Sequence, residues 1–399
     1  MGGDRRNFTP GGVDVAGLPM MLLPGLEAIW AALPEARVVG GAVRDMLAGC
    51  EVADVDFASP LAPEEVMVRA KRAGLKAIPT GLAHGTVTLV AAGRGFEVTT
   101  LRRDVETDGR HARVVFTNDW QADAARRDFT FNAMSCTQDG EVFDYFGGRD
   151  DLRAGIVRFV GVPSQRIAED YLRILRFFRF FARYGRHAPE AASLLALSAG
   201  KLGIRALSPE RVWDELKKIL SAPAPLKAVA LMQETGVLEL VLPGARLADL
   251  ASLMAKDAPA APLLRVAALT NEDLAGRLRL SSAEARAFSA WRAPLEISPG
   301  DEDASLRRAL AKTPYDVLVA QSWLQGGDEA AWSDLRTRLA ALPCPVFPLQ
   351  GRDLAALGIE PGPRMGQSLA AIRHWWLAGG CVADHTACLA WGQMNLGGE

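Results

Sequence analysis

The strongest constraint on the fold is a change in sequence pattern part-way along the chain. Up to about residue 152, short runs of β-branched residues alternate with glycines, as at 85–90 and 96–100. Beyond Ile167 such runs nearly stop, and Ala, Leu, Arg and Glu recur with a helical period. Runs of the first kind predict strands, and a period of 3.6 residues predicts amphipathic helices. We therefore expect an α/β domain built on a mixed sheet, followed by an all-α remainder.

Local signals place individual elements within this outline. Strands are predicted at 37–41, 55–57, 85–90, 96–100 and 142–145. Helical spacing predicts helices at 26–33 and 63–73, and Pro63 suits the first turn of the second one. In the later part, Ser208 before Pro209 predicts a capped helix start, and Leu242-Pro243-Gly244 predicts a stop. Connectors are expected at 259–262, 294–303 and 342–348.

Composition excludes several classes of protein. A chain of 399 residues that is 49% hydrophobic and 23% charged is folded and holds several domains. Its formal charge of −2 excludes a uniformly basic nucleic-acid-binding protein. No apolar run reaches the length of roughly 18 to 20 residues that a membrane helix needs, and residues 1–10 are polar. The five cysteines form no CxxC pair, so we expect reduced thiols and a cytoplasmic protein.

A glycine pair ends the first predicted strand and opens the next helix. Gly40 and Gly41 would let backbone N–H groups approach a phosphate closely, because glycine has no side chain to block the approach. Arg44 follows one turn into the helix and adds a forked cationic donor. These three residues predict half of a nucleotide site.

Carboxylates on two predicted strands are candidates for a metal site. Alternation along a strand places Asp54 and Asp56 on one face and Val55 in the core. Mg²⁺ binds few carboxylates and completes its shell with water and substrate phosphate, so this pair suits it. Glu97 on the later strand is the candidate for a third catalytic acid. A solvated strand edge for the pair, and an exposed position for Glu97, are the alternative interpretations.

These motifs, with four more segments, resemble the class II tRNA nucleotidyltransferases, the CCA-adding enzymes of the polymerase-β-like superfamily. The matching segments are 38–45 with 54–57, then 126–134, 144–152, 169–180 and 208–216. The resemblance implies a nucleotidyltransferase head at 1–152, a helical neck that recognises the base at 153–222, and a helical body and tail that bind tRNA at 223–399. It also implies a flexible hinge at the glycines of 144–152.

The same resemblance implies residue roles. Gly41, Arg44 and Arg127 would hold the triphosphate, Asp128 the ribose, and Asp170 with Arg173 the base. Arg176 and Arg179 would support phosphate or the helix face before them. The charged segment 102–113, centred on Asp-Gly, is interpreted as the mobile loop that the family needs to switch from cytidine to adenosine addition. A plain solvated loop is the alternative.

The segment 169–180 supports base recognition on chemical grounds. If it is one helix, Asp170, Arg173, Arg176 and Arg179 recur every three residues along one slowly drifting face. A carboxylate beside a guanidinium complements the pairing edges of cytosine and adenine, which present a donor beside an acceptor. Uracil and guanine present the reverse order and would leave buried polar groups unpaired. The alternative is a surface helix with intrahelical Asp-to-Arg pairs.

The predicted activity is template-free addition of C, C and A to tRNA from CTP and ATP, with Mg²⁺ as cofactor. The partners implied are the acceptor arm and elbow of tRNA, and the chain would act as a monomer or homodimer. The rivals are a poly(A) polymerase, an enzyme that adds only A or only CC, and a silent tRNA-binding protein. The last hundred residues carry 8 basic and 11 acidic side chains, which disfavours the basic tail expected of the polymerase.

Overall fold

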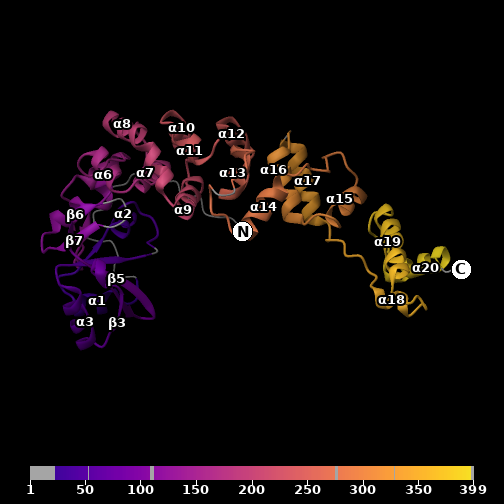
Figure 1. Ribbon diagram of the computed structural model, residues 1–399, viewed down its shortest axis with the longest axis horizontal. Helices are drawn as coiled ribbons and strands as arrows, with labels where there is room; N and C mark the ends of the chain where they lie inside the picture. The colour runs from indigo at the N-terminus through magenta and orange to yellow at the C-terminus, as the bar shows by residue number, and fades with distance from the viewer. Residues whose placement is uncertain (1–22, 53, 108–111, 275–276, 328, 397–399) are drawn as a thin grey trace. The chain divides into compact units, whose positions relative to one another are not determined.

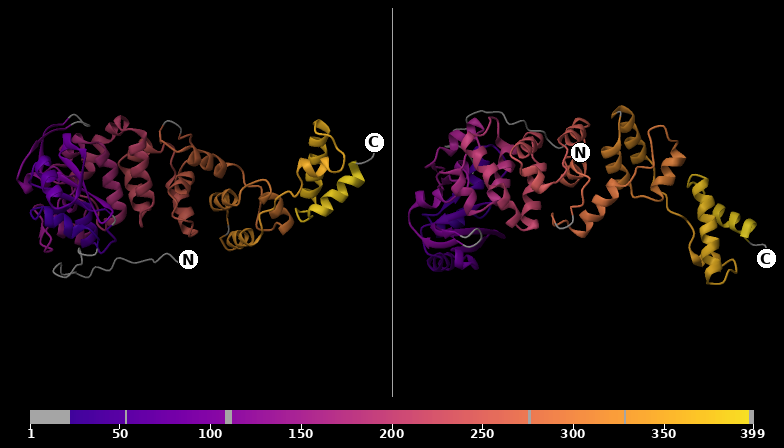
Figure 2. Two further views of the ribbon diagram at one scale, coloured as in Figure 1. Left: turned by 90° about the horizontal axis from the view of Figure 1, so that it is seen from below. Right: turned by 45° about the horizontal axis from the view of Figure 1, so that its top comes forward.

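The computed structural model describes residues 23–52, 54–107, 112–274, 277–327 and 329–396, without the side chains of 104–114. The chain divides into two compact units. The first extends to Pro243 and includes Leu278, and the second holds Gly244–Ala275 and Arg279–Glu399, apart from the undescribed residues. Among the described residues, strands occur only in the indigo-to-purple part of the chain, and helices make up the part from magenta to yellow (Figures 1 and 2). The expected mixed sheet followed by helices is confirmed.

One seven-stranded sheet forms the core of the head, in the order β3-β4-β5-β2-β1-β8-β9. Its strands are β1 Arg37–Val39, β2 Asp56–Ser59, β3 Lys76–Gly81, β4 Thr86–Ala91, β5 Arg94–Thr100, β8 Ser135–Cys136 and β9 Val142–Phe143. The central pair β2 and β5 runs parallel, and the other neighbours are antiparallel. Asp56 at the start of β2 lies opposite Glu97 in the middle of β5. Side chains from both strands therefore meet where β2 begins.

Helices and short turns surround this sheet. They are α1 Leu26–Ala32, α2 Gly41–Leu47, α3 Pro63–Arg72, the 3₁₀ turn η3 Leu82–His84, α4 Trp120–Ala125 and the 3₁₀ turn η4 Thr130–Asn132. Both helices predicted before residue 80 are confirmed, with Pro63 in the first turn of α3. Phe57 and Phe96 of the central strands are buried, and the Phe57 ring meets Trp30 of α1 edge-on at 5.4 Å. The apolar alternation of the strands therefore packs α1 onto the sheet.

The charged segment 102–113 corrects one prediction. We expected a loop, but β6 Arg102–Thr107 and β7 Ala112–Phe116 form a separate two-stranded antiparallel sheet. Charged residues hide the alternation that marks a strand, although Asp-Gly between two extended runs is also a hairpin signal. Residues 108–111, the centre of the expected mobile loop, lie outside the described residues.

The helices that follow the sheet continue the first unit. They are α5 Gly148–Ala154, α6 Pro163–Glu169, α7 Leu172–Tyr184, α8 Ala191–Gly200, the 3₁₀ segment η5 Lys201–Ala206, α9 Pro209–Leu220, α10 Pro225–Glu234 and α11 Val237–Val241. Phe129 next to η4 packs against Phe159, Phe177 and Phe180 with ring centroids 4.8 to 6.1 Å apart. Buried aromatic rings contribute large apolar areas, so this cluster holds α7 against the head.

Gly148, in the segment expected to be a hinge, is tightly packed. A Cβ atom at this position would lie 2.3 Å from the carbonyl oxygen of Thr130. The adjacent Gly147 has φ of +75°, a backbone conformation that favours glycine. Close packing and backbone conformation therefore account for the glycine pair, and the hinge stays a prediction.

The described residues of the second unit form helices joined by connecting segments, and no strand occurs among them. Its helices are α12 Leu247–Ala255, α13 Pro262–Leu269, α14 Ser282–Arg292, α15 Asp303–Leu310, α16 Tyr315–Gln325, α17 Glu329–Ala341, α18 Gly351–Ala355, α19 Pro363–Ala378 and α20 His385–Leu396. The three predicted connectors lie between helices as expected. Separate apolar clusters form around Leu306 and Leu335, and around Ile372 and Trp376. None of these or the other described helices is long and apolar enough to cross a membrane.

Candidate active site

The predicted carboxylates come together at one end of the central strands. Asp54, Asp56 and Glu97 line a pocket of about 340 Å³. Asp56 begins β2 and lies opposite Glu97 of the parallel strand β5. Val55 and Phe96 are buried, whereas all three acids are exposed. The alternation predicted for 54–56 is confirmed, and Glu97 faces the same pocket as the pair.

The acids in this pocket disfavour one another's negative charge. The pKa of the Asp56 carboxyl is raised, first by desolvation and then by the nearby charges of Glu97 and Asp54, while Arg127 opposes the rise. A cation would neutralise this crowded charge. Among the described residues, no group of three His, Cys, Asp or Glu side chains would hold a metal ion alone. Two carboxylates, with water and substrate phosphate as further ligands, nevertheless fit the usual requirement of Mg²⁺.

The glycine turn lies beside Arg127. Gly40 has φ of +69°, and a Cβ atom there would lie 2.9 Å from Nη1 of Arg127. Arg127 donates to the carbonyl oxygen of Asn132 at 3.4 Å and to Asp123 at 3.4 Å. Because its charge also acts on Asp56, Arg127 connects the glycine turn to the carboxylate pocket. The backbone conformation at position 40 favours glycine, and its lack of a side chain leaves room for the Arg127 guanidinium.

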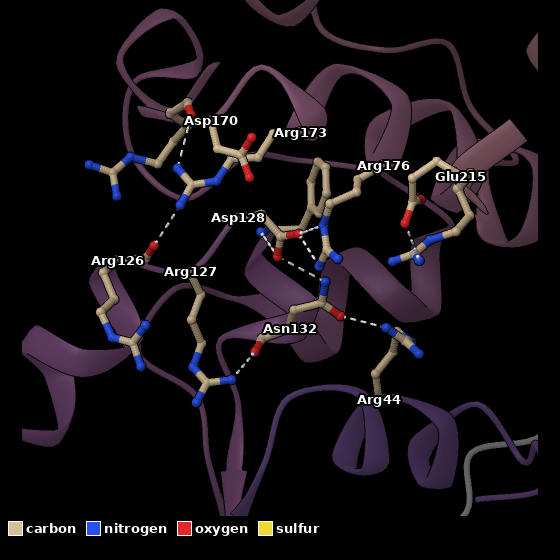
Figure 3. Close-up of polar contacts among 12 residues, drawn as sticks. Arg44, Arg126, Arg127, Asp128, Asn132, Asp170, Arg173, Arg176 and Glu215 are labelled. Atoms are coloured by element: carbon tan, nitrogen blue, oxygen red, sulfur yellow. Dashed lines mark hydrogen bonds and ion pairs between the residues drawn. The ribbon is translucent and has the colours of Figure 1, made fainter. Parts of the chain in front are cut away.

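Asp128 is the centre of a polar network that joins the head to α7 (Figure 3). Its Oδ2 accepts a hydrogen bond from Nε of Arg176 at 2.6 Å, and its Oδ1 accepts one from Nδ2 of Asn132 at 2.9 Å. The Asn132 side-chain oxygen in turn accepts from Arg44 at 2.7 Å. Burial alone would raise the pKa of Asp128, but Arg176 and the hydrogen bonds lower it below its ordinary value. Asp128 is therefore a buried, charged anchor for Arg176.

Asp170 lies outside the helix in which we expected it. Asp170 has an extended backbone and follows the last residue of α6. Its Oδ1 accepts a hydrogen bond from the backbone N–H of Leu172 at 3.0 Å. Aspartate commonly binds free N–H groups at a helix start, which explains the break. Its Oδ2 accepts from Arg211 of α9 at 2.8 Å. The expectation of one helix through 169–180 is thus wrong at its first residues.

The arginines of α7 bind three different neighbours. Arg173 contacts Glu169 of α6 and donates to the carbonyl oxygen of Arg126 at 3.1 Å. Arg176 binds Asp128, and Arg179 donates to the buried Glu215 of α9 at 3.0 Å. These partners belong to other elements, so the alternative of intrahelical Asp-to-Arg pairs is wrong.

Asn132, Arg211 and Glu215 carry contacts for which the sequence predicts no role. Each lies in a segment that resembles a family motif. Their partners Arg44, Asp170 and Arg179 are 88, 41 and 36 residues away in the sequence, respectively. The only sequence signal available was the presence of polar residues at otherwise apolar helix faces, such as the buried Glu215.

Comparisons with known proteins agree with this geometry. Residues 36–158 match a family model described as the poly A polymerase head domain, and 190–248 match one described as a probable RNA and SrmB-binding site of polymerase A. The Geobacillus stearothermophilus CCA-adding enzyme is 32% identical over 374 residues, which cover 85% of this chain and 87% of the relative. The crystal structure of the Bacillus stearothermophilus CCA-adding enzyme in complex with CTP has a TM-score of 0.72 and 27% identity, and covers 94% of this chain and 98% of its own.

A eukaryotic relative extends the similarity over most of both proteins. The mitochondrial CCA tRNA nucleotidyltransferase 1 of Danio rerio is 38% identical over 367 residues, which cover 86% of this chain and 83% of the relative. The matches include the head with its carboxylate pocket and the helices beyond it. The chain therefore belongs to the family of CCA tRNA nucleotidyltransferases, the CCA-adding enzymes.

Proposed function

We propose that this protein adds C, C and A to the 3′ end of tRNA from CTP and ATP without a nucleic-acid template. The observation that carries the proposal is that one helix, α7, connects the carboxylate pocket of the head with the residues proposed to recognise the base. The carboxylate pocket of the head could bind a metal and triphosphate, and α7, bound to the head through Asp128 and Arg176, begins at the residues suited to base recognition. Relatives named for this activity cover most of the chain.

The head residues supply phosphate binding and metal ligands in this proposal. Asp54 and Asp56 would hold Mg²⁺, with Glu97 beside them as a third catalytic acid. When bound, Mg²⁺ makes the 3′-hydroxyl more acidic and neutralises charge on the triphosphate. The amide of Gly41, with the Arg127 guanidinium, would hold the triphosphate, whereas the N–H of Gly40 donates to the carbonyl oxygen of Met134 at 3.2 Å and Gly40 would serve by its open backbone turn. Asn132 and Asp45 orient Arg44, which would add a further donor.

Base selection is assigned to Asp170 and Arg173. Each carboxylate oxygen of Asp170 accepts one hydrogen bond from the residues described above and has a second lone pair. Arg173 has five N–H donors and three acceptors around it, so donors remain for a base. The pair therefore retains the capacity to complement the donor and acceptor of cytosine or adenine. Asp128, proposed from the resemblance to contact the ribose, would do so while it anchors Arg176.

The helices of 223–399 are the proposed binding surface for the acceptor arm and elbow of tRNA. Regular helices suit recognition of an A-form duplex by shape and backbone contact. A relative's structure holds CTP, in agreement with the nucleotide proposed here. The cytoplasmic location and the monomeric or dimeric state stay predictions from the sequence.

The test is extension of a tRNA that lacks its 3′-terminal CCA. Purified protein and Mg²⁺ are incubated with CTP, ATP or both, and the products are sequenced. We expect CC with CTP alone and CCA with both nucleotides. Asp54→Ala should lower the rate by on the order of 10² to 10³, the equivalent of several kcal/mol of transition-state stabilisation. The matched control is Asp139→Ala, which removes an exposed carboxylate outside the site and should retain the wild-type rate.

Other products would contradict the proposal in distinct ways. Long A tails would identify a poly(A) polymerase, and A alone or CC alone would identify an enzyme that shares the pathway with a partner. Tight binding of tRNA without any extension would identify a silent binding protein. Equal rates for Asp54→Ala and wild type would remove the carboxylate pocket from the mechanism.

A further inference from the structure

A second pocket in the first unit carries a concentration of positive charge. It has a volume of about 380 Å³ and lies where α2, α7 and the end of α9 meet. Five cationic side chains line it, namely Arg44, Arg179, Arg183, Lys217 and Lys218. We call it the basic pocket. None of the described residues that line it is acidic.

Acidic groups behind the basic pocket neutralise only part of this charge. Asp45 pairs with Arg44 at 2.8 Å, Asp214 pairs with Lys217 at 2.9 Å, and Glu215 pairs with both Arg179 and Lys218. Five cations therefore face three carboxylates, which leaves an excess of two positive charges. Glu215 is buried, whereas Lys218 is 54% exposed and Arg183 is also exposed. The excess charge thus lies on the side open to solvent.

The cations in the basic pocket are close enough to act on one another. The pKa of Arg179 is lowered to about 10, mainly by burial and further by Arg176 and Arg44, while Glu215 opposes the shift. Phe180 lies under the same group, with the Arg179 guanidinium 4.3 Å and the Arg44 guanidinium 4.9 Å from its ring centroid. Contacts with an aromatic face hold these two guanidinium groups in place.

Helix dipoles alone do not explain this arrangement. Lysine and arginine are favoured in the last turn of a helix, where Arg183 of α7 and both lysines of α9 lie. That preference acts on each helix separately and applies equally to Lys71 and Arg72, which end α3. It gives no reason for cations from three helices to line one pocket. An anionic ligand does.

We infer that the basic pocket binds backbone phosphates of the tRNA substrate. This inference rests on the proposed function, because it requires an RNA substrate. Lysine and arginine are the usual contacts of nucleic-acid phosphates, and they position the strand without reading its sequence. The two exposed cations, Arg183 and Lys218, would make the outer contacts, and the half-buried Lys217 would make an inner one.

The separation of the two pockets favours the RNA strand over the nucleotide triphosphate as the source of phosphate. The carboxylate pocket and the basic pocket share no lining residue. The cation that acts on Asp56 is Arg127, which does not line the basic pocket. A triphosphate that reacts at Asp54 and Asp56 therefore has Arg127, with Arg44 at the edge of the basic pocket as a further donor. Arg183, Lys217 and Lys218 remain for the other phosphate-bearing substrate.

The experiment measures the salt dependence of tRNA binding. The test variant Arg183→Gln with Lys218→Gln removes two exposed charges of the basic pocket. The control variant Lys71→Gln with Arg72→Gln removes one lysine and one arginine, both exposed, from the end of α3. Kd for tRNA lacking CCA is measured by fluorescence anisotropy between 50 and 200 mM KCl, and Kd for CTP is measured in parallel by calorimetry.

We expect the test variant to lower the slope of log Kd against log salt by about 2, or about 1 for each phosphate that the protein no longer binds. Over this fourfold range, Kd of the wild type should then change about 16-fold more than Kd of the variant. The control variant should follow the wild type, and Kd for CTP should stay the same in all proteins. Arg183→Lys with Lys218→Arg keeps both charges and should restore most of the slope.

Two results would overturn the inference. The first is an unchanged slope in the test variant, and the second is weaker CTP binding with unchanged tRNA binding, which would assign the basic pocket to the triphosphate. The extension assay separates these failures from failure of the proposed function. Addition of CCA by a test variant with the wild-type slope refutes only the inference. A reduced slope in a protein that never extends tRNA refutes only the proposed function.

Discussion

The ion pair between Asp128 and Arg176 should contribute much of the free energy that holds α7 against the head. The Asp128 side chain is 7% exposed, and that of Arg176 is 32% exposed. Asp128 also accepts hydrogen bonds of 2.9 Å from Asn132 and from the backbone N–H of Phe129. The two partners are therefore unequal, because the carboxylate is buried while the guanidinium reaches water.

This difference in burial predicts which of the two substitutions weakens the packing of α7 on the head more. Loss of the partner of a fully buried charge costs about 3 to 5 kcal/mol. In Arg176→Gln, Asp128 keeps its other two hydrogen bonds and the site is partly exposed, so we expect a smaller cost of about 2 to 3 kcal/mol. In Asp128→Asn the released guanidinium can be hydrated, so we expect about 1 to 2 kcal/mol. The double variant should cost no more than Arg176→Gln, which gives a coupling of about 1 to 2 kcal/mol.

The assay is amide hydrogen exchange of peptides from α7, followed by mass spectrometry. It reports the local free energy of opening and avoids the assumption that a chain of two units unfolds in one step. Peptides from α16 in the second unit serve as an internal control and should not change. A larger loss of protection in Asp128→Asn than in Arg176→Gln, or single effects that add to within about 0.5 kcal/mol, would refute the reasoning.

The same pair should be sensitive to acid. The folded protein lowers the pKa of Asp128 below 3.8, against the effect of burial, through Arg176 and the hydrogen bonds. A carboxyl with a lowered pKa contributes stability that is complete above its ordinary pKa and is lost as pH falls through the lowered value. The difference in α7 protection between wild type and Asp128→Asn should therefore shrink below about pH 4, and a constant difference down to pH 2 would contradict this.

Two further predictions concern the carboxylate pocket and the base-recognition site. Asp56→Asn relieves crowded negative charge, so in EDTA it should raise the midpoint of urea unfolding above that of the wild type, with Asp139→Asn as the control that leaves it unchanged. With Mg²⁺ present, the same variant should lose CCA addition. An unchanged or lower unfolding midpoint would contradict it. Arg211→Gln frees one oxygen of Asp170, so the ratio of kcat/KM for CTP and UTP should fall about tenfold, with partial rescue by Arg211→Lys. An equal loss with both nucleotides would show that Arg211 supports only the fold.

Local patterns were sufficient to predict the central strands of the head. β5 and the residues 54–57 that lead into β2 are predicted because buried apolar residues alternate with exposed ones, and the same alternation identifies the carboxylate pocket. β3 was missed since it contains Pro79 and has no fully buried residue. Proline is tolerated in an edge strand, and β3 lies at the edge of the sheet, so its sequence lacks the usual signal. β8 has only two residues, too few to show any period.

The contacts between side chains could not be predicted in this way. Arg176 and Asp128 are 48 residues apart, and Arg211 and Asp170 are 41 apart. Which charged groups meet depends on how α7 and α9 pack on the head, and no local period encodes that packing. The resemblance to a family indicated that these segments matter, but it assigned ligands to most of these residues and named no protein side chain as the partner of any of them. The structure adds the protein partners that hold the groups proposed to bind ligands.

The three-residue spacing of the arginines on α7 illustrates why local patterns do not predict the contacts between side chains. Three residues advance an α-helix by about 300°, so each successive arginine is turned by about 60° from the one before. Such a series cannot present all its members to a single ligand. It suits a helix that is bound from several sides, and Arg173, Arg176 and Arg179 indeed contact α6, the head and α9, respectively. Only Arg173, beside Asp170 at the start of α7, keeps a position compatible with base recognition, whereas Arg176 and Arg179 set the position of the helix that carries it.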